Sequence, residues 1–498
     1  MNHYDDIVVG SGISGMTMSM LLGRAGRKVL LLEKQHCVGG SMRRFVRNGI
    51  PFDTGFHFTG GFGELLSDML KALGIESSIE PLPLDTSDKN HIYLADSAEM
   101  FDLPSGFDAI RQALYKYFPA EKNAINQYFD MEISIRNRTS FMDIDKLNTL
   151  DLPELFEDID ENYLSLKEYL DSITACDKLK TILAGFALCY GSPPKITSLA
   201  NHCRASYGLH RNLTKVKNGG QAFVDAFKKE ARNHNIEIRT GTTIKSVENI
   251  VRQKASSVTL SDNSCYSIDN CIMCIHPKEI LNILPARKVP QQTRETVLNY
   301  QESITFFSIF TELKIDYPVK PNLISMLSCA DIDTIIDNKS PASAMAVLTG
   351  TEEINGSSHS LLCAFETEAP SSGDRWRNTL HRSKDKSYQQ YKLKKAEDMI
   401  RRIEHILPEF KGKIKLTNTS SVLTFEDYIP PYGSAYGIMH KMNETPLFGR
   451  LPIRNFYAAG QNAVLPGLLG AMLSSFITAR FILGKNFIVY SKLKTNLR

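Results

Sequence analysis

The residues with the clearest chemical meaning are three glycines near the start of the chain. Gly10, Gly12 and Gly15 match the pattern G-x-G-x-x-G in the run GSGISG. This spacing arises often by chance, so it has meaning only between a strand and a helix. In that context Gly10 makes a tight turn, Gly12 lets the backbone approach a phosphate, and Gly15 lets the helix pack closely on the strand. The chemistry they indicate is binding of a dinucleotide pyrophosphate.

The segments on either side of the glycines supply that context. Residues 4–9 (YDDIVV) and 28–33 (KVLLLE) are mostly apolar runs, and an apolar helix is expected between them, to about residue 25. Continuous apolar strands are typical of a parallel sheet that is covered on both faces. We therefore expect a βαβ unit, in which the free N–H groups at the start of the helix face the phosphates.

Glu33 indicates which dinucleotide is bound. It ends the second strand, 18 positions after Gly15. A carboxylate at this place accepts hydrogen bonds from a ribose diol and repels a 2′-phosphate, which favours the adenosine of FAD or NAD over NADP. No second glycine pattern of this kind follows a strand, so we expect no additional nucleotide domain of the disulfide-reductase type.

Further motifs resemble one family of flavoproteins. The run KQHCVGGSMR after Glu33 is similar to the E-x(5)-G-G-x-x-R stretch of a large flavoprotein group. Five more runs resemble motifs of the phytoene desaturase, carotenoid isomerase and retinol saturase family: FDTGFHF at 52–58, KNGG at 217–220, IHP at 275–277, YGSAYG at 432–437 and FYAAGQ at 456–461. The first of these is more similar to the isomerase and saturase branch. The likeness spans the chain, but residues 82–215 and 286–420 match only in general character.

The resemblance implies FAD as the cofactor and implies which residues hold it. Val247 would present backbone groups to the adenine, or else be an ordinary buried strand residue. Gly460 and Gln461 would contact the flavin, and a helix starting near residue 466 would point its N-terminus at the pyrimidine edge, where negative charge grows on reduction. The full set of expected cofactor-binding residues is Gly10, Gly12, Ser14, Gly15, Glu33, Lys34, Gly39, Gly40, Ser41, Met42, Arg43, Val247, Gly460, Gln461, Gly467, Leu468 and Leu469.

The implied fold class is α/β, with a Rossmann-like FAD-binding domain of the glutathione-reductase type and an inserted α+β substrate domain. Short strand patterns at 236–239, 243–247, 257–260 and 271–275 predict a β-meander beside the parallel sheet. Residues 82–215 have helical patterns, such as 107–118 and 164–190, and residues 384–406 predict a charged, solvated helix. We expect the FAD-binding domain to comprise 1–81, 216–285 and 426–498, and the substrate-binding domain to comprise 82–215 and 286–425.

Catalytic side chains are harder to predict, because a flavin moves a hydride by itself. His57 lies beside the segment expected to line the flavin, and imidazole titrates near neutral pH, so it is a candidate for proton transfer. Packing with a hydrogen bond to backbone is an equal alternative. Tyr432 and Tyr436 would face the ring and substrate or pack on the sheet, and we select Tyr436 as the second catalytic candidate.

A metal site is not expected. Cys271, Cys274 and His276 lie close together in sequence. The strand pattern places residues 271 and 274 on opposite faces, and no second cysteine pair lies nearby to complete a zinc site. We interpret these cysteines as small apolar residues of a buried strand.

Composition excludes several classes of protein. The 498 residues include 58 Lys and Arg against 55 Asp and Glu, a net charge of +3, and 42% hydrophobic residues. This is typical of a globular protein and argues against nucleic-acid binding. Nine cysteines form no disulfide framework. With no secretory signal and no apolar run of about 18 residues, we expect a cytoplasmic protein.

The C-terminal run 463–483 has two interpretations. It is followed by Lys485, Lys492, Lys494 and Arg498, so it could lie peripherally on the inner face of an anionic membrane. The alternative, which we favour, is a core helix that covers the flavin and is followed by a frayed basic tail.

The function that these observations indicate is an FAD-dependent oxidoreductase acting on carbon–carbon double bonds of an apolar, lipid-like substrate. The resemblance implies a long polyene or isoprenoid, carotenoid-like or retinoid-like, that undergoes isomerisation, saturation or desaturation. A flavin amine oxidase is one alternative, because it shares the architecture. Another is a non-catalytic prenyl-binding protein of the GDP-dissociation-inhibitor type, which the intact glycine pattern and Glu33 disfavour.

Overall fold

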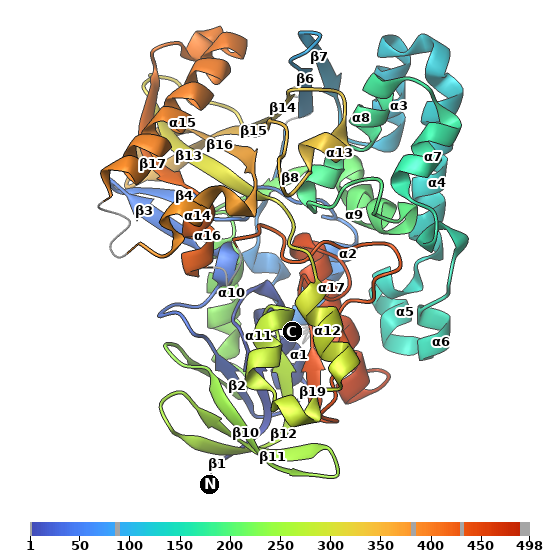
Figure 1. The fold of residues 1–498 in the computed structure, drawn as a ribbon, viewed down its shortest axis with the longest axis vertical. Helices are drawn as coiled ribbons and strands as arrows, with labels where there is room; N and C mark the ends of the chain where they lie inside the picture. Colours follow the sequence, from blue (N-terminus) through green and yellow to red (C-terminus); the bar gives the residue numbers. More distant parts are fainter. Residues whose placement is uncertain (1, 85–89, 380–384, 429–432, 489–498) are drawn as a thin grey trace, which may run out of the picture.

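Two large β-sheets organise the chain, one built around the N-terminus and one from its middle (Figure 1). The structure is a computed structural model that describes residues 2–84, 90–379, 385–428 and 433–488. In Figure 1 the first sheet lies at the lower end, the second at the upper left, and a group of helices at the upper right.

The first sheet confirms the predicted parallel sheet and most of the predicted meander. The predicted strand 236–239 is not part of the meander, because it pairs in parallel with the strand at 29–32 on the other side of the sheet. Its strand order is β10-β11-β12-β1-β2-β9, with β19 beside β12 and β18 beside β19. β1 is parallel to β2 and β12, whereas β10, β11 and β12 are antiparallel. The strands are β1 (Asn2–Val9), β2 (Val29–Leu32), β9 (Ile236–Arg239), β10 (Ile244–Val251), β11 (Lys254–Leu260), β12 (Cys265–Met273), β18 (Gly449–Arg450) and β19 (Phe456–Ala458).

Alternate residues of β1 enter two different hydrophobic cores, because successive side chains of a strand point to opposite faces. Val8 packs among the helices α1 and α17, while Ile7 and Val9 lie in the core under the meander. Cys271 belongs to the second core and Cys274 packs against the first, as the strand pattern predicted. The helices around this sheet are α1 (Ile13–Arg24), α2 (Leu65–Leu73), α10 (Gln221–Ala231), α11 (Pro277–Ile283), α12 (Gln291–Asn299) and α17 (Gly467–Leu483).

The apolar C-terminal run forms the core helix α17. Phe476 has an exposed fraction of 0%, and the helix packs along α1. Lys485 Nζ lies 2.6 Å from the Asp151 carboxylate, and residues 492, 494 and 498 are outside the described residues. Phe476 is therefore not available to a membrane surface. None of the helices in the described ranges has the length and apolar character that a membrane-spanning segment needs.

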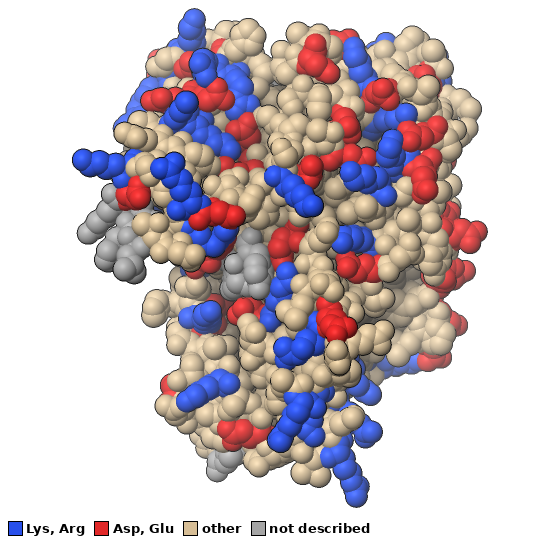
Figure 2. All heavy atoms as spheres, viewed as in Figure 1, with Lys and Arg blue, Asp and Glu red and all other residues tan. Residues whose placement is uncertain are grey.

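The second sheet has the order β17-β13-β16-β15-β14-β6-β7. Ala396, Met399 and Ile403 of helix α15 (Lys386–Ile406) cover one face, which confirms the predicted charged helix and gives its apolar side a place to pack. Figure 2 shows basic and acidic side chains interspersed over the visible face of the molecule. The strands are β6 (Asn90–Leu94), β7 (Glu99–Leu103), β13 (Thr305–Leu313), β14 (Asn322–Leu327), β15 (Ala344–Ile354), β16 (Ser357–Glu368) and β17 (Ile414–Ser420).

Residues 82–215 are not purely helical, contrary to the sequence pattern. β6 and β7 form a hairpin, and β6 pairs in parallel with β14 of the second sheet. This pairing joins residues more than 200 positions apart, so local periodicity does not reveal it. The predicted helical run 164–190 is broken into α7 (Leu166–Ile173), α8 (Asp177–Leu183) and a 3-10 segment (Gly185–Cys189).

The remaining elements connect the two sheets. The helices of the insertion are α3 (Phe107–Tyr117), α4 (Lys122–Arg138), α5 (Ile144–Thr149), α6 (Leu152–Leu155), α7 (Leu166–Ile173), α8 (Asp177–Leu183) and α9 (Leu199–Arg211). Short helices α13 (Ile332–Ile335), α14 (Asp374–Arg377) and α16 (Val422–Tyr428) lie near the second sheet. Two small antiparallel sheets complete the described fold: the hairpin of β3 (Arg44–Arg47) with β4 (Ile50–Asp53), and the pair of β5 (Pro81–Pro83) with β8 (Thr214–Val216), which joins distant parts of the chain.

The burial of α17 predicts a stability difference between two phenylalanines of the same helix. Phe476→Ala should lower the free energy of unfolding by about 3–5 kcal/mol, because it opens a cavity in the core. Phe481 is only partly buried, and Phe481→Ala should cost about half as much. Urea denaturation of the two variants measures both values, and equal losses would contradict this placement of the helix.

Candidate functional site

The glycine turn between β1 and α1 has the geometry of a phosphate cradle. A Cβ atom on Gly15 would lie 1.8 Å from the carbonyl oxygen of Gly10, so only glycine allows this approach of helix to turn. A Cβ on Gly12 would meet nothing within 4 Å. No side chain caps the start of α1, so within the described residues its first N–H groups are available to an anion. The open side of Gly12 is therefore where a pyrophosphate fits.

Glu33 is tied to the same turn. Its carboxylate accepts hydrogen bonds from the backbone N–H of Ser11 at 3.0 Å and from Ser11 Oγ at 2.5 Å, and the N–H of Gln35 donates to its other oxygen at 2.8 Å. The side chain is 9% exposed. Contact of Glu33 with a ribose stays a prediction. The next residue, Lys34, is exposed, and its contact with the cofactor also stays a prediction.

The glycine pair after Glu33 folds back over the cradle. The N–H of Gly39 donates to the carbonyl of Ser11 at 3.0 Å, and Gly40 approaches Gly12 so closely that a Cβ on it would lie 3.1 Å from the Gly12 Cα. Arg43 donates from Nε to the Gly40 carbonyl at 3.1 Å. The structure thus brings this predicted segment onto the turn.

The C-terminal segment meets the N-terminal one at the same place. Ser14 Oγ lies 2.6 Å from Ser475 Oγ of α17, and the N–H of Gly460 donates to Ser474 Oγ at 2.7 Å. Gln461 accepts a hydrogen bond through its backbone carbonyl from His440 Nε2 at 2.9 Å. Both predicted halves of the cofactor site therefore adjoin each other, although 400 and more residues separate them.

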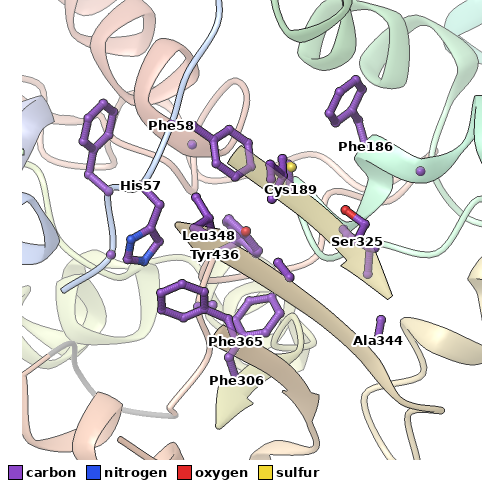
Figure 3. A pocket seen from close by; sticks show the side chains of 18 of the residues that line it. His57, Phe58, Phe186, Cys189, Phe306, Ser325, Ala344, Leu348, Phe365 and Tyr436 are labelled. Atoms are coloured by element: carbon purple, nitrogen blue, oxygen red, sulfur yellow. The ribbon is translucent and has the colours of Figure 1, made fainter. Parts of the chain in front are cut away.

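A large, mainly apolar cavity opens beside these segments (Figure 3). On the side of the first sheet it is lined by expected cofactor residues: Ser41, Met42, Gln461, Gly467 and Leu468. Leu469 lies just outside it, against Gly61 and Gly208. Val247 lies in the core beneath the meander, apart from the cavity. Phe58, which follows strand β4, also lines it. Much of the remaining lining comes from the second sheet and the helical insertion, including Ile92, Phe186, Leu323, Leu348 and Phe365.

His57 lies on the wall of this cavity, with its ring centroid 4.0 Å from that of Phe365. The pKa of His57 is lowered to about 4, mainly because burial disfavours the charged ring. The positive charges of Lys215 and Arg44 also lower this pKa, and the Asp53 carboxylate raises it in part. The expectation that this imidazole titrates near neutral pH is therefore wrong. Within the described part of the chain no group makes a hydrogen bond to its ring, so the alternative of a histidine bound to backbone is not observed.

Tyr436 also lines the cavity, and its ring packs edge-on to Phe306 at 6.1 Å. Its backbone N–H donates to Ser303 Oγ at 3.1 Å, which positions the loop. Burial raises the pKa of Tyr436 above its usual value, so the phenol stays protonated. Tyr432, the neighbouring candidate, lies outside the described residues.

Sequence analysis missed two polar residues of this region, Glu132 and His210. His210 lines the cavity and its Nδ1 lies 2.9 Å from the Glu132 carboxylate. The two residues are 78 positions apart on different helices, and no motif marks either of them. Only the packing of α4 against α9 could have revealed the pair.

The turn, the helix start and the returning glycine pair together define a dinucleotide-binding flavoprotein, and the residues present fit FAD. The family description "Flavin containing amine oxidoreductase" matches residues 13–314. The chain belongs to this family. It is an FAD-dependent oxidoreductase.

Individual relatives support the same class. The all-trans-retinol 13,14-reductase of Homo sapiens is 23% identical over 98% of this chain and 87% of its own length. The prolycopene isomerase of Daucus carota is 31% identical over 31% of this chain and 24% of its own length. These relatives confirm the resemblance to the retinol saturase and carotenoid isomerase family.

Solved structures confirm the fold. An oxidoreductase of Methanosarcina mazei superposes with a TM-score of 0.65 at 14% identity, covering 94% of this chain and 98% of that one. Cyclohexylamine oxidase of Brevibacterium oxydans gives 0.59 at 13% identity, covering 96% and 97%.

The two glycines of the cradle predict separable defects. Gly12→Ala should leave the melting temperature of the apoprotein unchanged, since its Cβ meets no protein atom, but weaken FAD binding tenfold or more because the methyl group blocks the pyrophosphate. Gly15→Ala should lower the melting temperature itself, since its Cβ meets the Gly10 carbonyl. Thermal melting and FAD titration measure the two effects. Unchanged FAD affinity in Gly12→Ala would refute the cradle.

The lowered pKa of His57 predicts a loss of stability in acid. The unfolded chain binds a proton at this histidine below about pH 6.5, whereas the folded chain does so only below about pH 4. Stability from His57 is therefore full above pH 6.5 and falls by up to ~3 kcal/mol between pH 6.5 and 4. The variant His57→Asn should lack this part of the decline. Denaturation curves at several pH values test it, and parallel pH profiles for the two proteins would contradict the assignment.

Proposed function

We propose that this FAD-dependent oxidoreductase reduces a carbon–carbon double bond of a long apolar polyene. The observation that carries the proposal is the cavity, which joins the expected flavin-contacting residues to an apolar lining from the second sheet and the helical insertion. An apolar pocket with few polar groups suits a hydrocarbon chain. Among the described residues, no Asp, Glu, Lys or Arg side chain lines the cavity, so none of these charges is there to hold a polar substrate.

Coverage of the relatives favours reduction over isomerisation. The retinol reductases match 98% of this chain, whereas the prolycopene isomerases match 31% of it. One relative that matches 97% is an inactive all-trans-retinol 13,14-reductase of Danio rerio. Likeness over the full length therefore supports the fold and substrate class, and the reaction needs a direct test.

The residues of the cavity have proposed parts in the reaction. FAD held beside these residues and reduced by an external electron carrier would supply a hydride to one carbon of the double bond. The other carbon takes a proton, for which we propose the protonated hydroxyl of Tyr436 as donor, replenished by water. His57, neutral at physiological pH, is proposed to orient the polyene against the flavin rather than to give up a proton. The N-terminus of α17 would stabilise negative charge on the cofactor side.

The same lining residues support a proposal for which parts of the chain bind the substrate and which bind FAD. We propose residues 82–215 and 286–425 as the substrate-binding domain, because they contribute Ile92, Phe186, Leu323 and Phe365 to the cavity. Residues 1–81, 216–285 and 426–498 would hold FAD. A substrate of this kind dissolves in lipid, so peripheral membrane contact of a cytoplasmic protein stays a prediction.

A spectroscopic experiment tests the reaction. The protein with bound FAD is reduced anaerobically and mixed with all-trans-retinol or with a poly-cis carotenoid. Reduction of the polyene shifts its absorption to shorter wavelength while the oxidised flavin spectrum returns, because conjugation is shortened and two electrons are transferred. A change in polyene spectrum without flavin oxidation would show isomerisation instead. No change with either polyene in either redox state would refute the proposal.

Two controls sharpen this result. Tyr436→Phe should retain FAD and slow polyene reduction by about 10²-fold or more, the usual contribution of a proton donor.

The alternative function, amine oxidation, is tested by adding cyclohexylamine to the oxidised enzyme. Flavin bleaching and peroxide release on adding the amine would favour an amine oxidase.

A further inference from the structure

A buried carboxylate and a histidine form a polar pair at the wall of the otherwise apolar cavity. Glu132 of α4 is 0% exposed and His210 of α9 is 4% exposed. His210 Nδ1 lies 2.9 and 3.0 Å from the two oxygens of the Glu132 carboxylate. Ser206 Oγ donates a further hydrogen bond to Glu132. The carboxylate is thus fully engaged by two neighbours on α9.

The pair leaves one polar atom for the cavity. A buried carboxylate is costly unless it is hydrogen-bonded, and His210 Nδ1 and Ser206 Oγ are the side-chain partners found for Glu132 among the described residues. The Nδ1–H is used in this contact. The Nε2 atom has no hydrogen-bond partner in the described ranges, while the residue itself lines the cavity. Nε2 accepts a hydrogen bond in the neutral ring and donates one in the doubly protonated ring.

The surroundings of His210 are aromatic. Its ring centroid lies 4.8 Å from that of Phe186 and 5.3 Å from that of Phe129. Figure 3 shows Phe186 and His57 on opposite sides of the cavity. Because its ring packs against Phe186, His210 is on the side of the helical insertion, away from His57.

We propose that His210, held by Glu132, binds the hydroxyl group of an alcohol at one end of the polyene. A hydroxyl group can both donate and accept, so it pairs with Nε2 in either state of the ring, whereas a carboxylate would bring a further negative charge into a mainly apolar cavity. A pure hydrocarbon would displace water from Nε2 and leave this nitrogen unpaired, which opposes binding. This inference rests on the proposed function and narrows its substrate class to polyenes with an oxygen at one end.

The test compares two ligands that differ only at that oxygen. All-trans-retinol and the hydrocarbon in which hydrogen replaces its hydroxyl group are titrated into the FAD-bound protein, and binding is followed by polyene fluorescence. The wild-type protein should bind the alcohol about tenfold or more tightly than the hydrocarbon. The double substitution His210→Phe with Glu132→Gln should abolish this preference by weakening alcohol binding alone. An unchanged preference, or equal loss for both ligands, would overturn the inference.

A second histidine of α9 supplies the matched control. His202 is 0% exposed, its ring nitrogens lie 2.7 and 2.8 Å from the hydroxyls of Tyr128 and Tyr190, and it does not line the cavity. His202→Gln should therefore keep the alcohol preference. The double substitution avoids leaving a buried carboxylate unpaired, and the melting temperature of each variant shows that it is folded.

Binding and turnover separate this inference from the proposed function. If the protein binds the alcohol in a His210-dependent way but reduces no polyene, the site stands and the proposed reaction fails. If it reduces alcohol and hydrocarbon alike, independently of His210, the reaction stands and this site is refuted.

Discussion

The close approach of Gly15 to the Gly10 carbonyl is the contact on which the rest of the structure depends. It places the N-terminus of α1 directly over the end of β1, where unpaired N–H groups can meet a pyrophosphate. Helix α17 packs along α1 in this position, and a hydrogen bond between Ser14 Oγ and Ser475 Oγ joins the two helices. The segment around Gly39 and Gly40 closes over it from the other direction. Three distant parts of the chain thereby meet where the sequence predicts the cofactor to bind.

Desolvation dominates the chemistry of the cavity beside that site. It lowers the pKa of His57 and raises that of Tyr436, so both groups are kept neutral at physiological pH. A neutral wall is suited to an apolar substrate, because the substrate displaces little bound water from it. The buried Glu132 carboxylate is tolerated because His210 and Ser206 both hydrogen-bond to it.

The two faces of the second sheet pack against different parts of the molecule: one lies against helix α15 and the other lines the cavity. Helix α15 covers one face with aliphatic side chains, and the opposite face supplies Leu348 and Phe365 to the cavity. The β6–β7 hairpin extends this sheet toward the helical insertion. Sheet and insertion consequently enclose the cavity together, and neither could do so alone.

The βαβ unit, most of the meander and the core helix α17 could be predicted from short apolar runs in the sequence. The glycine spacing and Glu33 indicated FAD or NAD, and the resemblance to a flavoprotein family selected FAD. Only the tertiary structure decided where β6 pairs, that burial lowers the pKa of His57, and that Glu132 meets His210. Burial and contacts between residues far apart in the chain depend on how whole elements pack, and short-range sequence patterns do not contain that information. The residues on the expected cofactor side of the cavity could therefore be named from motifs, whereas those of the opposite wall could not.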